Sequence, residues 1–122
     1  MASRILILLA GLMGAAGVAL AAEAAHGASG AGLDSAAYLL LFHAVAVLAG
    51  TAFLDKGQLW RPALIAALVA WVAGSVLFAA DIGSRAFAGQ RLFPLAAPAG
   101  GTVLIIAWLA LALAAVGAAR KQ

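Results

Sequence analysis

Five ionisable side chains stand out because they fall within otherwise apolar stretches of the chain. They are two acids, two histidines and one arginine: Glu23, His26, His43, Asp81 and Arg85. Glu23 and His26 are three positions apart, and Asp81 and Arg85 are four apart, so each pair shares one face of a helix. Ionisable groups inside a bilayer are costly and are expected to face inward and pair. We therefore predict one polar cluster in the outer half of the membrane, with Asp81 paired to Arg85, and Glu23 paired to His26, His43 or Arg85.

This predicted cluster fits two kinds of role. Acids and histidines near one surface could bind a small solute or handle protons. The same groups could form a structural clasp that keeps the helix ends in register. The interpretation favours a clasp for Asp81 with Arg85 and a structural hydrogen bond for His43. For Glu23 with His26, both roles stay open.

Two glycines complete the candidate site. Gly100 and Gly101 follow Pro98 at the start of the last apolar segment, at the expected depth of the polar cluster. Glycines let another backbone come close, and the free N–H groups of a helix start can bind an anion or a carboxylate. We therefore count Gly100 and Gly101 among the candidate binding residues.

Patterns typical of enzymes and metal sites are not evident. The chain has no cysteine, no HExxH motif and no phosphate-binding glycine loop, and no basic residue is placed to activate a serine. A metal site built from His26, His43 and a carboxylate matches in residue type only. We expect no enzyme activity, no metal and no cofactor. A membrane enzyme acting on lipid or quinone is the least favoured interpretation.

The composition indicates an integral membrane protein. Of 122 residues, 67% are hydrophobic and only 9% are charged, and the mean hydropathy is +1.16. A soluble domain of this size has too little interior for so much apolar surface. The net charge of +3 arises from basic residues scattered at segment ends, which membrane topology predicts, so we expect no nucleic-acid partner.

Four apolar segments are long enough to span a bilayer as helices. They cover residues 5–25, 36–54, 62–85 and 98–119. The links between them are short, so sequential neighbours should run antiparallel. We predict an all-α fold: a single transmembrane domain, residues 1–122, folded as an up-down-up-down bundle of four helices.

The orientation follows from lysine and arginine near the segment ends. On one side we expect Arg4, Lys56, Arg61, Arg120 and Lys121, and on the other Arg85 and Arg91. Cytoplasmic loops carry an excess of basic residues. This split predicts a multi-pass protein of the cell's inner membrane with both termini in the cytoplasm.

The first segment also has features of a signal peptide: a basic start, an apolar core and the small-residue stretch "ALAAEAAH", residues 19–26. Its apolar run is longer than a usual signal core, and cleavage near Ala22 would remove the partner of the second helix. We expect the segment to be retained.

Small residues recur along the helix faces. The first segment has Gly11, Gly14, Ala15 and Gly17, and the third and fourth have similar stripes that include Gly74 and Gly117. Lipid gives no hydrophobic drive for helix association, so small residues that permit close approach favour helix contacts. The stripes predict packing within the monomer or in an oligomer. The expected partners are the lipid bilayer and either further copies of the chain or another membrane protein.

Four stretches resemble a known family: "GAAGVALAAEAAHG", "YLLLFHAVAVLAG", "LFAADIGSRAFAGQRLFPLAAPAGG" and "LIIAWLALALAAVGA". In this order they are similar to the YgdD-like family of small inner-membrane proteins, a domain of unknown function. The landmarks are His26-Gly27, Phe42-His43 and the Pro-Ala-Gly-Gly stretch of residues 98–101. The chain departs from the family pattern where Ala79-Ala80 replaces Ser-Gly before Asp81, which puts any role of that hydroxyl in doubt.

The resemblance implies four membrane helices with both termini inside, and it supplies no activity. It adds weight to His26, His43, Asp81 and the Pro-Gly-Gly turn as one unit. The sequence therefore predicts a structural or interaction component that packs into an oligomer or a larger membrane complex. The alternative is a carrier or channel for a small solute or protons that uses the polar cluster.

Overall fold

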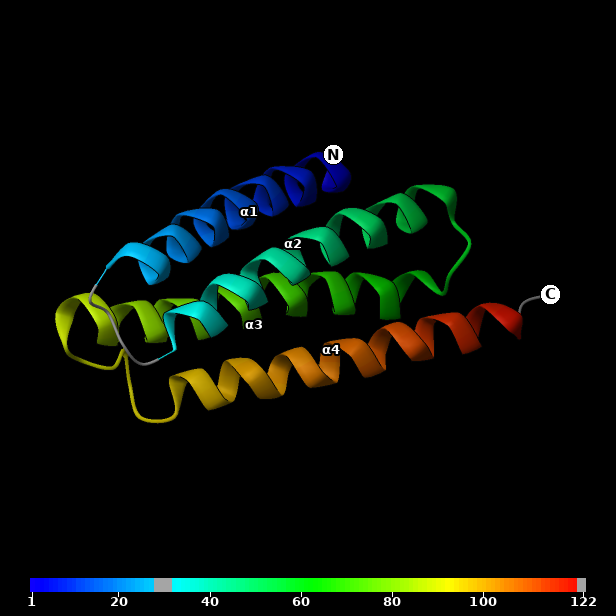
Figure 1. The fold of residues 1–122 in the computed structure, drawn as a ribbon. Coiled ribbons are helices and arrows are strands. Elements are labelled where there is room, and N and C mark those ends of the chain that lie inside the picture. The colour runs from blue at the N-terminus through cyan, green and yellow to red at the C-terminus, as the bar shows by residue number, and fades with distance from the viewer. Residues whose placement is uncertain (28–31, 121–122) are drawn as a thin grey trace.

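The chain folds into four α-helices, which Figure 1 shows running in alternating directions. A computed structural model describes residues 1–27 and 32–120, and within these ranges the helices are α1 (Ala2–His26), α2 (Leu33–Lys56), α3 (Arg61–Ala88) and α4 (Ala96–Ala119). All four are long and apolar enough to cross a membrane. The predicted all-helical fold of four helices, each able to span a membrane by length and composition, is confirmed within the described residues. Lys121 and the middle of the first link lie outside the described residues.

The helices begin or end up to three residues beyond the predicted segments. The first helix begins at Ala2 instead of Ile5, and the third ends at Ala88 instead of Arg85. Hydropathy marks only the apolar part of a helix, whereas the backbone continues as helix through the polar ends. The fourth begins at Ala96, so Pro98 lies inside its first turn, where a missing N–H costs nothing.

Glycines set the ends of two helices. Gly57 after α2 and Gly89 after α3 both adopt the left-handed conformation, with φ of 66° and 71°. Their N–H groups donate to carbonyls of the preceding turn, which satisfies groups that a helix end leaves without partners. Pro62 lies in the first turn of α3, where its fixed φ suits a helix start.

The packing order follows the chain. Within the described residues, α1 packs on α2, α2 on α3, and α3 on α4, whereas α1 touches α3 only slightly and does not reach α4. Both termini lie at the same end of the molecule (Figure 1). The bundle is therefore open between its first and last helices.

The core centres on α3. Trp71 is the largest fully buried side chain, and Leu64 and Leu68 precede it on the same helix. Within the described residues α3 contacts each of the other three helices. By contrast, α1 buries only Ala10, Met13 and Gly17.

The closest approach of α3 and α4 occurs at two glycines. A Cβ on Gly100 would lie 2.8 Å from the Gly74 carbonyl oxygen and 2.8 Å from the Phe78 amide nitrogen. Both neighbouring atoms belong to the backbone and cannot turn aside. The two helices therefore touch main chain to main chain here, as small residues permit in membrane proteins.

Candidate functional site

His43 is held on both of its ring nitrogens. It lies on α2 and is 5% exposed. Its Nδ1 lies 2.7 Å from the Leu39 carbonyl oxygen, and Trp108 Nε1 of α4 lies 3.1 Å from its Nε2. An indole N–H can only donate, so Nε2 accepts, and Nδ1–H donates to Leu39. The imidazole in this arrangement is the neutral tautomer with its proton on Nδ1.

The His43 to Trp108 hydrogen bond joins two helices whose backbones do not pack together. The indole of Trp71, from α3, completes the group. Its ring centroid lies 4.6 Å from that of Trp108 and 6.5 Å from that of His43. Aromatic rings in tilted contact at these separations stabilise one another. This central aromatic group, His43 with Trp71 and Trp108, ties α2 to α4 beside α3.

Asp81 anchors the link between α3 and α4. Its side chain is buried, with the residue 1% exposed. Oδ1 accepts a hydrogen bond of 2.9 Å from the Leu92 backbone N–H, and Oδ2 lies 3.4 Å from an Arg85 guanidinium nitrogen. A buried carboxylate is stable only when paired and hydrogen-bonded, and both conditions are met here.

A second bond fixes the same link. Ser84 Oγ donates to the Gln90 carbonyl oxygen at 2.7 Å. The Asp81 and Ser84 bonds together hold the chain as it leaves α3, before α4 begins at Ala96. Asp81 and Arg85 therefore pair as predicted, and Asp81 also holds the link to the end of α3.

Glu23 and His26 do not join these groups. Both are exposed at the end of α1, and the Glu23 carboxylate lies against Gly27, the residue after the helix. Within residues 1–27 and 32–120, neither side chain forms a salt bridge, and the pairing expected between Glu23 and His26, His43 or Arg85 is not seen.

The structure separates the predicted cluster into three places. Trp71 and Asp81 are ten residues apart on α3, which corresponds to about 15 Å along a helix. His43 packs at the level of Trp71, so it lies near the middle of its helix, far from the Asp81 clasp and from the end of α1. The single outer cluster of the sequence analysis is therefore corrected. Hydropathy located the apolar segments, but it did not show at which level of the bundle each polar residue lies.

The two candidate glycines differ. Gly100 is buried against the α3 backbone, whereas a Cβ on Gly101 would meet nothing within 4 Å. That the start of α4 could bind an anion or a carboxylate stays a prediction, and the Asp81 carboxylate does not use it. Asp81 accepts from Leu92, four residues before the helix. The close contact of α4 with α3 accounts for a glycine at position 100, whereas Gly101 takes part in no such contact.

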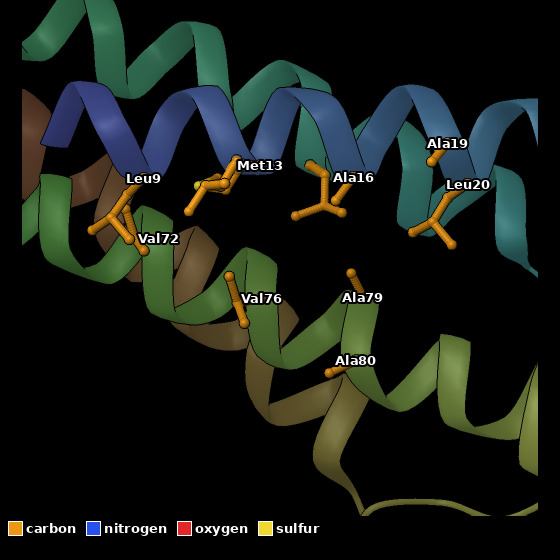
Figure 2. A pocket seen from close by; sticks show the side chains of 11 residues that line it. Leu9, Met13, Ala16, Ala19, Leu20, Val72, Val76, Ala79 and Ala80 are labelled. Carbon is orange, nitrogen blue, oxygen red and sulfur yellow. The ribbon is translucent and has the colours of Figure 1, made fainter. Parts of the chain in front are cut away.

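A groove of about 520 Å³ lies between α1 and α3. Its walls are apolar, and the sticks in Figure 2 include no nitrogen or oxygen. None of the predicted polar residues lines it. No group of three His, Cys, Asp or Glu within residues 1–27 and 32–120 could hold a metal ion. The side chains that line the groove therefore offer a polar solute no hydrogen-bond partner.

Comparison with known protein families identifies one that matches the chain. The model of a family described as "Protein of unknown function (DUF423)" matches residues 13–101. The chain belongs to the DUF423 family. The match covers α2 and α3 completely, most of α1 and the start of α4. No curated protein and no solved structure matches the chain.

The DUF423 match confirms the resemblance as one to a family of unknown function. The narrower YgdD-like grouping stays a prediction. The matched range contains Asp81, Arg85 and the glycine contact of α3 with α4, but it ends before Trp108.

The partners of His43 and Asp81, two of the four buried polar or charged residues within the described ranges, were not predicted from the sequence. Trp108 lies 65 positions from His43, and the Asp81 bond goes to a backbone group, which no side-chain pattern reveals. One signal was available: the indole N–H of a tryptophan can only donate, and inside an apolar helix it favours a nearby acceptor, as Trp108 has in His43. Few acceptors exist in these apolar helices, so His43 was the natural candidate.

Proposed function

We propose that this DUF423 member is a structural protein of the inner membrane that associates with a second copy of itself through α1. The narrower YgdD-like grouping is part of the proposal. The observation that carries it is the outward face of α1. Gly11, Gly14, Ala15 and Val18 lie on this face at the spacing of neighbouring turns, and a Cβ on Gly11 or Gly14 would meet nothing within 4 Å.

Five other helical glycines pack closely against a neighbouring element of the monomer, whereas Gly83 and Gly101, like Gly11 and Gly14, do not. A Cβ on Gly17 would lie 2.7 Å from Leu41 of α2, and a Cβ on Gly50 would lie 2.7 Å from Leu68 of α3. Gly74, Gly100 and Gly117 likewise face another element closely. Glycine weakens a helix by about 1 kcal/mol relative to alanine. Gly11 and Gly14 carry that cost without a close contact in the monomer, and they lie together on one face of one helix, which supports a contact with another chain.

The arrangement of α1 supports the same proposal. This helix buries three residues and leaves most of its length open. An outward stripe of small residues lets two parallel helices approach closely within lipid. Two copies inserted in the same orientation would present this face at the same depth, which suits a symmetric dimer.

The carrier alternative has no observation that favours it. Both nitrogens of His43 are engaged, Asp81 is buried against Leu92 and Arg85, and the groove between α1 and α3 is apolar. We therefore propose a non-catalytic role without a transported solute or a cofactor.

Charge supports an orientation with both termini in the cytoplasm. The end that holds the termini carries Arg4, Lys56, Arg61 and Arg120 with one acid, Asp55. The opposite end carries two basic residues and three acids: Arg85, Arg91, Glu23, Asp34 and Asp81. An excess of basic residues favours the cytoplasmic side.

The test is the mass of the protein in detergent by native mass spectrometry. We expect wild type to form dimers. The double variant Gly11→Leu with Gly14→Leu should be monomeric, because two bulky side chains would hold the α1 helices of the two copies apart. Ala112→Leu on the exposed part of α4 is the matched control and should leave the dimer intact. A wild type that is monomeric both in detergent and in lipid nanodiscs would overturn the proposal.

A further inference from the structure

Two hollows flank Trp60 at the end of the molecule that holds the termini. One, of about 490 Å³, lies between the α2–α3 link and the end of α4, and its lining includes Gln58, Trp60 and Arg61. The other, of about 280 Å³, is lined by Trp60, Leu113, Val116, Gly117 and Arg120. Trp60 is the shared wall, so the hollows lie side by side with one arginine in each.

Trp60 is fixed in this position. Its backbone N–H donates to the Ala114 carbonyl oxygen of α4 at 3.0 Å. Its ring lies so close to Gly117 that a Cβ there would approach the ring carbons to 3.0 Å. The absence of a side chain at Gly117 therefore lets the indole lie against α4. Tryptophan favours the level where lipid headgroups meet the hydrocarbon region.

The two arginines offer their guanidinium groups to a ligand. Both are exposed, and within residues 1–27 and 32–120 the one salt bridge joins Arg85 to Asp81 at the opposite end. The single acid at this end, Asp55, accepts a hydrogen bond from Ser3 Oγ. A guanidinium suits phosphate because it offers several N–H donors in one plane.

The second hollow changes from polar to apolar along α4. Arg120 lies at the end of the helix, Gly117 and Trp60 come next, and Leu113 and Val116 lie toward the middle of the membrane. This order matches a phospholipid, whose phosphate lies at the surface and whose acyl chain runs inward. A soluble phosphate would make no use of the apolar part.

We infer that this end of the protein binds an acidic glycerophospholipid, with its phosphate between Arg61 and Arg120 beside Trp60 and an acyl chain along Leu113 and Val116. The inference rests on charge complementarity and on the order of side chains in the hollow. It does not depend on association through α1. Basic pockets between membrane helices are suited to anionic headgroups in this way.

The experiment titrates the purified full-length chain in detergent with dioleoyl phosphatidylglycerol or dioleoyl phosphatidylcholine, and counts bound lipids by native mass spectrometry. One basic residue near an anionic lipid contributes about fivefold in affinity. We expect wild type to prefer phosphatidylglycerol, and Arg61→Gln with Arg120→Gln to weaken its binding about 25-fold. Phosphatidylcholine binding should change little.

Arg4→Gln is the matched control because it removes a cation at the same end that lines neither hollow. It should change phosphatidylglycerol affinity less than threefold, which is below the contribution of one arginine in the site. An equal loss in Arg4→Gln would overturn the site in favour of diffuse attraction. Equal affinity of wild type for both lipids, or displacement of phosphatidylglycerol by an equal concentration of inorganic phosphate, would also overturn it.

Discussion

The α3–α4 pair and the α1 helix are built in opposite ways. The first pair is joined at many points: the backbone contact of Gly74 with Gly100, the Asp81 bond to Leu92, and the Trp60 bond to Ala114. α1 has one side-chain hydrogen bond to α2 near its start, a few buried residues, and an apolar groove that separates it from α3. The comparison indicates that α3 and α4 are joined by polar and backbone contacts, whereas α1 packs along α2 through apolar and small residues and touches α3 only slightly.

This difference bears on function because the buried polar contacts lie in α2, α3, α4 and the link between α3 and α4. His43 and Asp81 have their hydrogen-bonding capacity used by Trp108, Leu39, Leu92 and Arg85. The open small-residue face lies on α1. Stability is therefore expected to reside in α2 to α4, and association in α1. Substitutions can test this division, beginning with the largest expected effect.

Gly100→Leu should destabilise the protein most. The new side chain would strike the backbone of Gly74 and Phe78, which can yield only if the helices separate. Overpacking of this kind costs about 3 kcal/mol. The measurement is the free energy of unfolding in mixed micelles. The control is Gly101→Leu, whose side chain enters open space. An equal loss of unfolding free energy in both variants would contradict the backbone contact of α3 with α4 at Gly74 and Gly100.

Asp81→Ala should cost about 2 kcal/mol in the same assay, because it removes the charge-assisted hydrogen bond between the buried Asp81 carboxylate and the Leu92 N–H. Asp81→Asn keeps an acceptor for that N–H and loses only the charge facing the half-exposed Arg85, so it should cost less than half as much. If Asp81→Asn lowered the free energy of unfolding as much as Asp81→Ala, the stabilising contact would be the ion pair with Arg85 and not the hydrogen bond from Leu92.

Trp108→Phe should cost about 1 kcal/mol. It keeps an aromatic ring beside Trp71 but removes the donor to His43 Nε2, and hydrogen bonds between membrane helices have typical strengths near this value. A double-mutant cycle with His43→Phe gives the coupling directly, since the two losses should not add. Strict additivity would show that the hydrogen bond contributes nothing.

Ser3→Ala should have the smallest effect, about 0.5 kcal/mol or less, because its bond to Asp55 is exposed to solvent. Unfolding free energy in mixed micelles again provides the measurement. A loss as large as that of Asp81→Ala would mean that α1 is attached as firmly as the α3–α4 pair, contrary to the comparison above.

The sequence was sufficient for the features that depend on local spacing. Apolar runs located the four helices, and the four-residue spacing of Asp81 and Arg85 placed them within reach of each other. The small residues of the third and fourth segments indicated close packing, and Gly74 proved to be one of the contacts. These predictions needed only the period of a helix.

The remaining features depend on how each helix is rotated and shifted against the next. His43 was expected near the Asp81 clasp, but it packs about three turns away beside Trp71. Glu23 and His26 share a face of α1, yet that face is turned away from the other polar groups. Spacing along one helix does not determine these relations, because side-chain packing between helices decides them.

The central claim, that α1 is the contact between two copies, is tested most directly by cysteine cross-linking in membranes. The chain has no cysteine, so Val18→Cys on α1 and Val45→Cys on α2 each introduce a single thiol, at positions that are 61% and 66% exposed. On mild oxidation we predict a disulfide-linked dimer for Val18→Cys and little for Val45→Cys. Equal cross-linking at both positions, or a dimer from Val45→Cys alone, would contradict the account.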